Sequence, residues 1–117
     1  MIAVVVSTAN RCHYCMVSHA AALRKLTEDP LLVEQLRTNY KYARLEPEER
    51  AMLDFAVKLT EAADRCTEAD LAALRDAGWS DEDIMDIAEV TAMFNYTNRL
   101  ASGLGWLPNA EFVRLGL

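Results

Sequence analysis

Two cysteines and a histidine near the start of the chain have types and spacing suited to redox chemistry. Cys12 and Cys15 are separated by two residues, and His19 follows Cys15 by four. Only the thiolate form of cysteine is a good nucleophile, and a thiol with a pKa of about 8.5 is mostly protonated at neutral pH. In a helix, His19 would lie one turn beyond Cys15 on the same face, where it can accept the thiol proton.

A neighbouring second thiol adds a step that a lone cysteine lacks. Once a peroxide has oxidised one sulfur to a sulfenic acid, the other thiol condenses with it to form a disulfide. We assign Cys15 as the attacking sulfur because His19 is its i+4 neighbour, and Cys12 as the resolving sulfur. A helix N-terminus stabilises negative charge, and that argument alone would favour Cys12 as the attacking residue.

Three other interpretations of these residues compete with redox chemistry. A zinc ion could take Cys12, Cys15 and His19, with Cys66 as a fourth ligand, but the second close ligand pair of a structural zinc site is missing. Covalent haem needs a histidine directly after the second cysteine, where this chain has Met16. Cysteine and histidine can also be ordinary core residues. The combined spacing favours the dithiol, and we expect no metal and no other cofactor.

Composition narrows the class of protein. The 117 residues suffice for one domain with a hydrophobic core, and the few glycines (4) and prolines (3) favour helix. The net charge of −6 argues against a nucleic-acid partner. No apolar run reaches the roughly 18 residues that a membrane span needs. An odd cysteine count without a recognisable secretion signal suggests a reducing cytoplasm.

The pattern of apolar residues predicts an all-α fold of about six helices. The predicted ranges are 2–9, 12–25, 30–38, 47–65, 67–78 and 81–104. Asp29 before Pro30 is typical of a helix start, and Thr67 and Ser80 each open a capping-box sequence. The apolar run 2–9 could also be a strand, but no later segment could pair with it. No internal repeat is evident, and residues 106–117 look irregular.

The spacing C-x-x-C-x-x-x-H, present as Cys12, Cys15 and His19, resembles the carboxymuconolactone decarboxylase-like superfamily. More narrowly, it resembles the AhpD-like alkylhydroperoxidases and the peroxidase-related proteins grouped with them. Segment 2–7 is similar to the helix that leads into this motif, and segments 77–84 and 94–100 are similar to the peroxidase-related branch. The resemblance covers nearly the whole chain.

This resemblance implies an all-α AhpD-like domain that assembles into a homo-oligomer. It implies thiol-dependent reduction of a hydroperoxide substrate by a thiol or dithiol reductant. Cys15 would be the peroxidatic residue, Cys12 the resolving residue and His19 part of the proton relay. No nucleic acid or membrane partner is implied. Two other functions remain open: a carboxymuconolactone decarboxylase-type enzyme, and a non-catalytic helical oligomer that senses oxidants or holds zinc.

One departure from the family pattern concerns the acid that orients the histidine. Family members carry a glutamate about three helical turns before the first cysteine, a position that falls just before Met1 here. We therefore expect residues 1–117 to form a single AhpD-like domain that lacks an N-terminal segment present in relatives. Glu61 or Glu89 could substitute for the missing glutamate from another helix.

Several polar and aromatic residues also belong near this site. Asn95 and Asn98 share the face of the last helix that carries its buried apolar residues, so their amides need partners. They could line the site, bridge two subunits or hydrogen-bond a nearby loop. Tyr14 lies between the cysteines and could shape the site or simply pack. Trp79 and Trp106 are more typical of packing or interface anchors.

Overall fold

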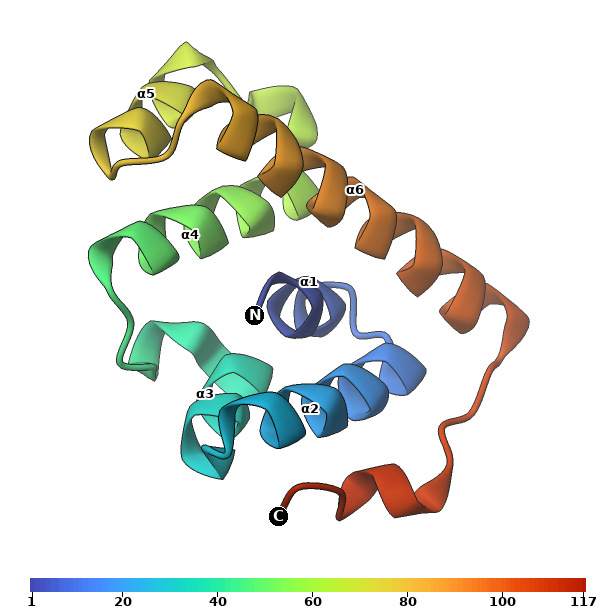
Figure 1. Cartoon of the computed structure of the whole chain (residues 1–117). Coiled ribbons are helices and arrows are strands. Elements are labelled where there is room, and N and C mark those ends of the chain that lie inside the picture. Colours follow the sequence, from blue (N-terminus) through green and yellow to red (C-terminus); the bar gives the residue numbers. More distant parts are fainter.

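The computed structural model describes residues 1–117 and contains helices and connecting segments only. Its six α-helices are arranged around the first of them (Figure 1). They are α1 (Ile2–Ala9), α2 (His13–Thr27), α3 (Pro30–Asn39), α4 (Pro47–Glu61), α5 (Glu68–Asp76) and α6 (Asp81–Leu104). Three short 3₁₀ helices, η1 (Tyr40–Tyr42), η2 (Ala63–Arg65) and η3 (Ala110–Val113), lie between or after them. The predicted all-helical fold is confirmed.

Helix α1 forms the centre of the molecule and contacts α2, α3, α4 and α6 (Figure 1). Four consecutive residues, Val4 to Ser7, are buried, so the helix is covered on all sides. An eight-residue helix is marginal in water, and its stability comes from this packing. The valine-rich run is therefore helical because it is surrounded by helices, and the alternative of a strand does not apply.

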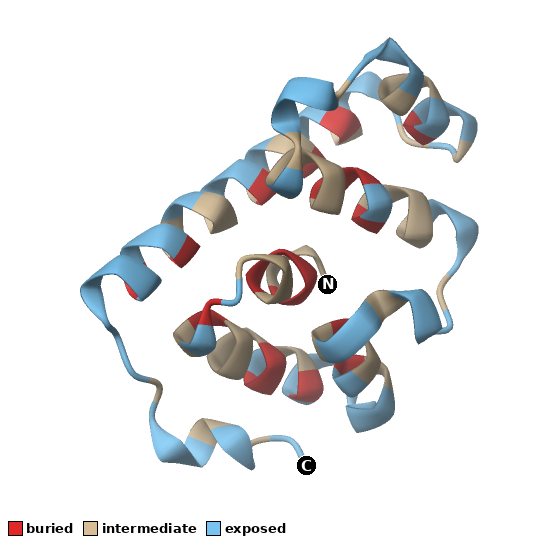
Figure 2. Ribbon diagram, turned by 180° about the vertical axis from the view of Figure 1, so that it is seen from behind, coloured by how far each residue is buried: buried red, intermediate tan, exposed pale blue.

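Two apolar clusters flank α1. The first joins α1 to α3 and α4 through Val4, Val5, Leu36, Ala43 and Leu53. The second joins α4, α5 and α6 through Phe55, Leu74, Ile84 and Ile87. The inner sides of the helices carry the buried residues, whereas their outer sides are exposed (Figure 2). None of the helices is both long enough and apolar enough to cross a membrane.

The predicted helix starts are confirmed by their caps. The Asp29 side chain accepts a hydrogen bond from the Leu32 N–H at 3.0 Å, and Ser80 accepts one from the Asp83 N–H at 3.0 Å. Thr67 opens a capping box with Asp70. Each cap satisfies backbone N–H groups that a helix leaves unpaired at its first turn.

The predicted end of α4 was wrong by four residues. The helix ends at Glu61 because Ala62 has an extended backbone (φ −150°), and residues 63–65 form a 3₁₀ turn instead. This break lets α5 fold back beside α4, where Lys58 forms an ion pair with Asp70 at 2.8 Å. Helix α2 begins at His13 with Cys12 as its N-cap, one residue later than expected.

Candidate functional site

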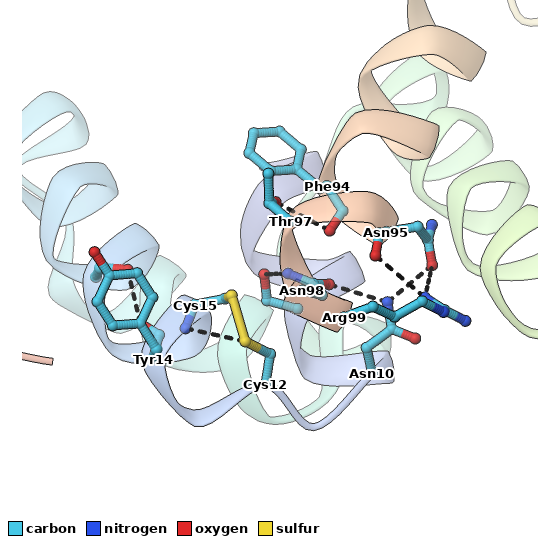
Figure 3. Close-up of a disulfide and its surroundings, with 11 residues drawn as sticks. Asn10, Cys12, Tyr14, Cys15, Phe94, Asn95, Thr97, Asn98 and Arg99 are labelled. Atoms are coloured by element: carbon cyan, nitrogen blue, oxygen red, sulfur yellow. Dashed lines mark hydrogen bonds between the residues drawn. A yellow bond between two sulfur atoms is a disulfide. The ribbon is translucent and has the colours of Figure 1, made fainter. Parts of the chain in front are cut away.

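The two cysteines of the motif lie at the N-terminus of α2 and are joined by a disulfide, with their Cα atoms 5.2 Å apart (Figure 3). Cys12 is the N-cap residue, and its sulfur accepts a hydrogen bond from the Cys15 N–H at 3.3 Å. Both residues are buried, with exposed fractions of 0% and 2%. The first turn of a helix therefore brings the two sulfurs together, as the spacing predicted.

A tight turn between α1 and α2 places Cys12 at this position. The Cys12 N–H donates to the Ser7 carbonyl at 3.0 Å, and the Arg11 N–H donates to the Thr8 carbonyl at 3.0 Å. Arg11 has a φ of +52°, a left-handed conformation that costs an L-residue free energy. Contacts outside the turn must therefore help to hold it.

Those contacts come from Asn95 and Asn98 of α6, which bond to Asn10 in the turn (Figure 3). The Asn10 side-chain amide donates to the side-chain oxygens of Asn95 and Asn98, both at 2.9 Å. The amide of Asn98, which is 1% exposed, donates to the Ser7 hydroxyl at 3.1 Å. The amide of Asn95 donates to the Thr60 hydroxyl at 3.0 Å. Of the roles considered for Asn95 and Asn98, bonding to a nearby turn is the one that the structure shows.

His19 lies one helical turn after Cys15 and is half-buried. Its ring meets the edge of Phe94 with the ring centres 5.0 Å apart and the planes at 75°. Burial lowers the pKa of His19, because the imidazolium loses solvation when it leaves water. The imidazole is therefore neutral at neutral pH and able to accept a proton.

The structure gives His19 no carboxylate partner. Glu61 lines a hollow with Thr8 and Tyr40, and Glu89 lies on the exposed face of α6. Neither forms a hydrogen bond or an ion pair with His19, so neither takes the place of the family's orienting glutamate in this structure.

Aromatic residues flank the disulfide on its other side. Tyr14 packs against the edge of Trp106 with the ring centres 5.8 Å apart, and Ala101 of α6 packs on both cysteines. Beside them is an open hollow of about 240 Å³, whose polar lining includes Arg11, His13 and Ser102. Trp106 thus serves as a packing anchor next to the site, in line with expectation.

Cys66 does not join the site. It lies between η2 and α5, where it packs against the cluster of Phe55, Leu74, Ile84 and Ile87. No three His, Cys, Asp or Glu side chains are grouped so that they could hold a metal ion. A zinc site that used Cys66 together with Cys12 and Cys15 is therefore not formed. Cys66 packs against one apolar cluster, and Cys12 and Cys15 belong to another.

This arrangement can interconvert a dithiol and a disulfide without moving the backbone far. The sulfurs are already within bonding distance, and the sulfur of Cys12 receives a backbone N–H at a helix N-terminus. His19, whose pKa is lowered by burial, lies one helical turn away.

Similarity to known proteins agrees with this picture. Residues 30–108 match the carboxymuconolactone decarboxylase family. The matched region begins after the cysteine motif and covers α3 to α6, so it does not test the site residues. No protein of curated function matches the chain.

Solved structures with the same fold include two uncharacterized peroxidase-related proteins. The protein from Silicibacter sp. TM1040 is 51% identical, with a TM-score of 0.97 over 99% of this chain and 61% of its own. A protein from Ralstonia eutropha JMP134, described as an alkylhydroperoxidase AhpD core, is 47% identical. Its TM-score is 0.93, over 98% of this chain and 60% of its own. A protein of unknown function from Agrobacterium tumefaciens shares the fold at 24% identity, with a TM-score of 0.80 over 94% and 75%.

The chain thus spans about three fifths of the length of its two more similar relatives. The family model matches most of the chain, and the two peroxidase-related structures match nearly all of it. Both findings indicate the same family. The protein belongs to the carboxymuconolactone decarboxylase family, in its AhpD-like, peroxidase-related branch.

Proposed function

We propose that the protein reduces hydroperoxides with electrons from thiols, using Cys12 and Cys15 as a redox-active pair. The observation that carries the proposal is the pairing of two buried sulfurs at the first turn of α2, with neutral His19 one turn beyond. The names of the two more similar relatives point to the same class of reaction.

In the first step, His19 accepts the proton of Cys15 and the resulting thiolate attacks the outer oxygen of the hydroperoxide. The O–O bond breaks, Cys15 becomes a sulfenic acid, and the departing alkoxide takes the proton from His19 to leave as an alcohol. Sulfur is oxidised by two electrons and the peroxide is reduced by two.

In the second step, the Cys12 thiolate attacks the sulfur of Cys15. The S–S bond forms, the S–O bond breaks, and hydroxide leaves as water after taking a proton. The two residues already lie close enough for this attack, because the Cα atoms of Cys12 and Cys15 are 5.2 Å apart. Two thiol equivalents from a reductant then restore the dithiol and become a disulfide themselves.

The test is peroxide consumption with dithiothreitol as the reductant. The unmodified protein should turn over repeatedly, Cys15→Ser should show no turnover, and Cys66→Ser should match the unmodified protein because Cys66 packs outside the site. Unchanged turnover in Cys15→Ser would overturn the proposal.

The same assay separates the other functions. An oxidant sensor would form the disulfide after one equivalent of peroxide without reductant, and with dithiothreitol it would consume peroxide no faster than dithiothreitol alone. A decarboxylase-type enzyme would act on a lactone substrate with both cysteines replaced by serine. Either result would replace the peroxidase assignment.

A further inference from the structure

The acids of this chain are absent from the segments that build the cysteine site. Of the 18 aspartates and glutamates, all but Glu111 fall between Glu28 and Glu89. Residues 1–27 and 90–110 form α1, α2 and the C-terminal part of α6, the elements around the disulfide, and contain no acid. Their basic residues are Arg11, Arg24, Lys25 and Arg99. The net charge of −6 is therefore carried by other elements than those that hold the redox pair.

The hollow beside the disulfide has a cationic lining. Arg11 and His13 line it from the turn before α2 and the first residue of α2, and Ser102 and Trp106 line it from the end of α6 and the segment after it. Arg11 is exposed and belongs to none of the ion pairs within the chain. A hollow lined by one sign of charge concentrates ligands of the opposite sign. Its occupant is therefore expected to be an anion.

Two residues connect this hollow with the redox pair. Tyr14 and Ala101 line the hollow, and both also pack against Cys12 and Cys15. Figure 3 shows Tyr14 beside the two cysteines at the start of α2. A ligand held in the hollow thus lies next to the disulfide, separated from it by one layer of side chains.

The disulfide needs a reductant that can reach a buried bond. Thiol–disulfide exchange requires a thiolate to approach one of the two sulfurs, and Cys12 and Cys15 are only 0% and 2% exposed. The reductant must therefore bring its thiol in through a neighbouring cavity. At about 240 Å³, the hollow is near the lower end of small-molecule sites and has room for a small thiol but not for a protein domain.

We propose that this hollow binds the reductant of the peroxidase cycle, and that the reductant is a low-molecular-weight thiol bearing a carboxylate. The inference rests on the proposed function, because it supplies the electrons for that cycle. The Arg11 guanidinium pairs with the carboxylate, and the Ser102 hydroxyl and the His13 ring offer hydrogen bonds to it. The thiol end of the ligand then faces the disulfide.

The exchange consumes two reductant molecules. The first thiolate attacks the sulfur of Cys12, which lies between Arg11 and His13 in the chain. The S–S bond of the protein breaks, a mixed disulfide forms on Cys12, and Cys15 leaves as a thiolate. The second thiolate attacks the reductant sulfur of the mixed disulfide and releases Cys12. The two reductants become a disulfide, and their two electrons and two protons pass to Cys12 and Cys15.

The test measures how fast two thiols of similar size and opposite charge reduce the disulfide of the full chain, without peroxide. Mercaptoacetate is anionic and cysteamine is cationic, and each is supplied in large excess. Each rate is divided by the rate at which the same thiol reduces hydroxyethyl disulfide, which removes differences in thiol reactivity. Mercaptoacetate should be favoured about tenfold, and about 0.5 M salt should reduce this preference. Equal rates, or a preference for cysteamine, would overturn the inference.

Charge reversal locates the preference. Arg11→Glu should make cysteamine the faster reductant, because the charge beside the hollow changes sign. Arg65→Glu is the matched control, since Arg65 is exposed, forms no ion pair and lies in η2, outside the lining of the hollow. This control should keep the preference for mercaptoacetate. Equal changes in both rates in Arg11→Glu would show that Arg11 only supports the turn, and would overturn the inference.

The outcome of this test is separate from that of the peroxidase assay. Turnover of peroxide with dithiothreitol, combined with no charge preference among thiols, would overturn the inference and leave the proposed function intact. A charge preference without peroxide turnover would overturn the proposed function alone, because the hollow would still select an anionic thiol.

Discussion

The side chain of Asn10 donates a hydrogen bond to Asn98 at 2.9 Å and thereby ties the turn before Cys12 to the C-terminal part of α6. Asn98 in turn donates to Ser7, whose carbonyl accepts the Cys12 N–H. Two hydrogen bonds, through Ser7, thus connect α6 with the backbone of the first cysteine. The position of Cys12, near the start of the chain, therefore depends on a helix near its end.

Replacing Asn98 by alanine should destabilise the protein and alter the dithiol. The change removes the donor to the buried Ser7 hydroxyl and leaves the half-buried Asn10 amide with Asn95 alone, so we expect a loss of about 1–3 kcal/mol in the free energy of unfolding. Because the turn then holds Cys12 less firmly, the reduction potential of the pair should also shift. Urea unfolding and equilibration with glutathione buffers measure the two effects.

Asn109→Ala is the matched control, because Asn109 is exposed and its side chain caps no helix. It should change neither the unfolding free energy nor the potential. If Asn98→Ala lowered stability but left the potential unchanged, the asparagine would support the fold alone and not the placement of Cys12.

The pH dependence of turnover should report on His19. Its pKa in the folded protein lies below the ordinary 6.5 because burial disfavours the charged ring. Proton acceptance from Cys15 should therefore persist at neutral pH and fall only below 6.5. His19→Gln should remove that acid limb and slow turnover about 10²-fold, a typical contribution of a general base. An unchanged pH–rate profile in the variant would exclude His19 as the base.

The same residue should make stability depend on pH. The unfolded chain binds a proton at His19 with a pKa near 6.5, whereas the folded chain resists protonation. The free energy of unfolding should therefore fall as the pH falls through 6.5, and this component should vanish in His19→Gln. Thermal unfolding of both proteins between pH 5 and pH 7.5 checks the difference.

Replacing Cys12 by serine should trap the oxidised form of Cys15. Without the resolving thiol, the sulfenic acid cannot close to the disulfide and should accumulate after one equivalent of peroxide. Dimedone labelling followed by peptide mass spectrometry locates it. The adduct should be found on the peptide that contains Cys15. If Cys12→Ser gave no adduct and the reciprocal variant, Cys15→Ser, gave an adduct at Cys12, the two roles would be exchanged.

Arg24 should hold the C-terminal segment against α2. This buried guanidinium donates to the carbonyls of Leu115 at 2.7 Å, Phe112 at 2.7 Å and Val113 at 3.2 Å. Arg24→Met should release residues 110–117, seen as faster amide exchange there, with about 1–3 kcal/mol lost in the free energy of unfolding. Arg114→Met is the control, because that exposed side chain donates no hydrogen bond.

A second variant probes the same contact from the other side. Gly116 has a φ of +79°, and a Cβ there would come within 2.7 Å of the Arg24 Cβ. Gly116→Ala should therefore loosen the segment even with Arg24 intact. Protected amides in both variants would show that the segment is held by other contacts.

Local signals in the sequence were enough to place most helices. Asp29 with Pro30, and Ser80 with Asp83, mark helix starts because a side-chain oxygen satisfies the first free N–H groups wherever the helix lies. The end of α4 was misjudged because residues 62–65 are compatible with a helix locally. Only the packing of α5 against α4 makes the chain turn at Ala62.

The pairing of Cys12 with Cys15 and the place of His19 one turn later were determined by the sequence itself, because two residues between cysteines at a helix start fix their separation within one turn. The surroundings of that pair were decided by the tertiary structure. Asn98, Phe94 and Trp106 reach the site from the far end of the chain, and their side chains gain these neighbours only when α6 packs across α1 and α2. Spacing along a helix is a local property, whereas burial, hydrogen-bond partners and the lowered pKa of His19 depend on which helices meet.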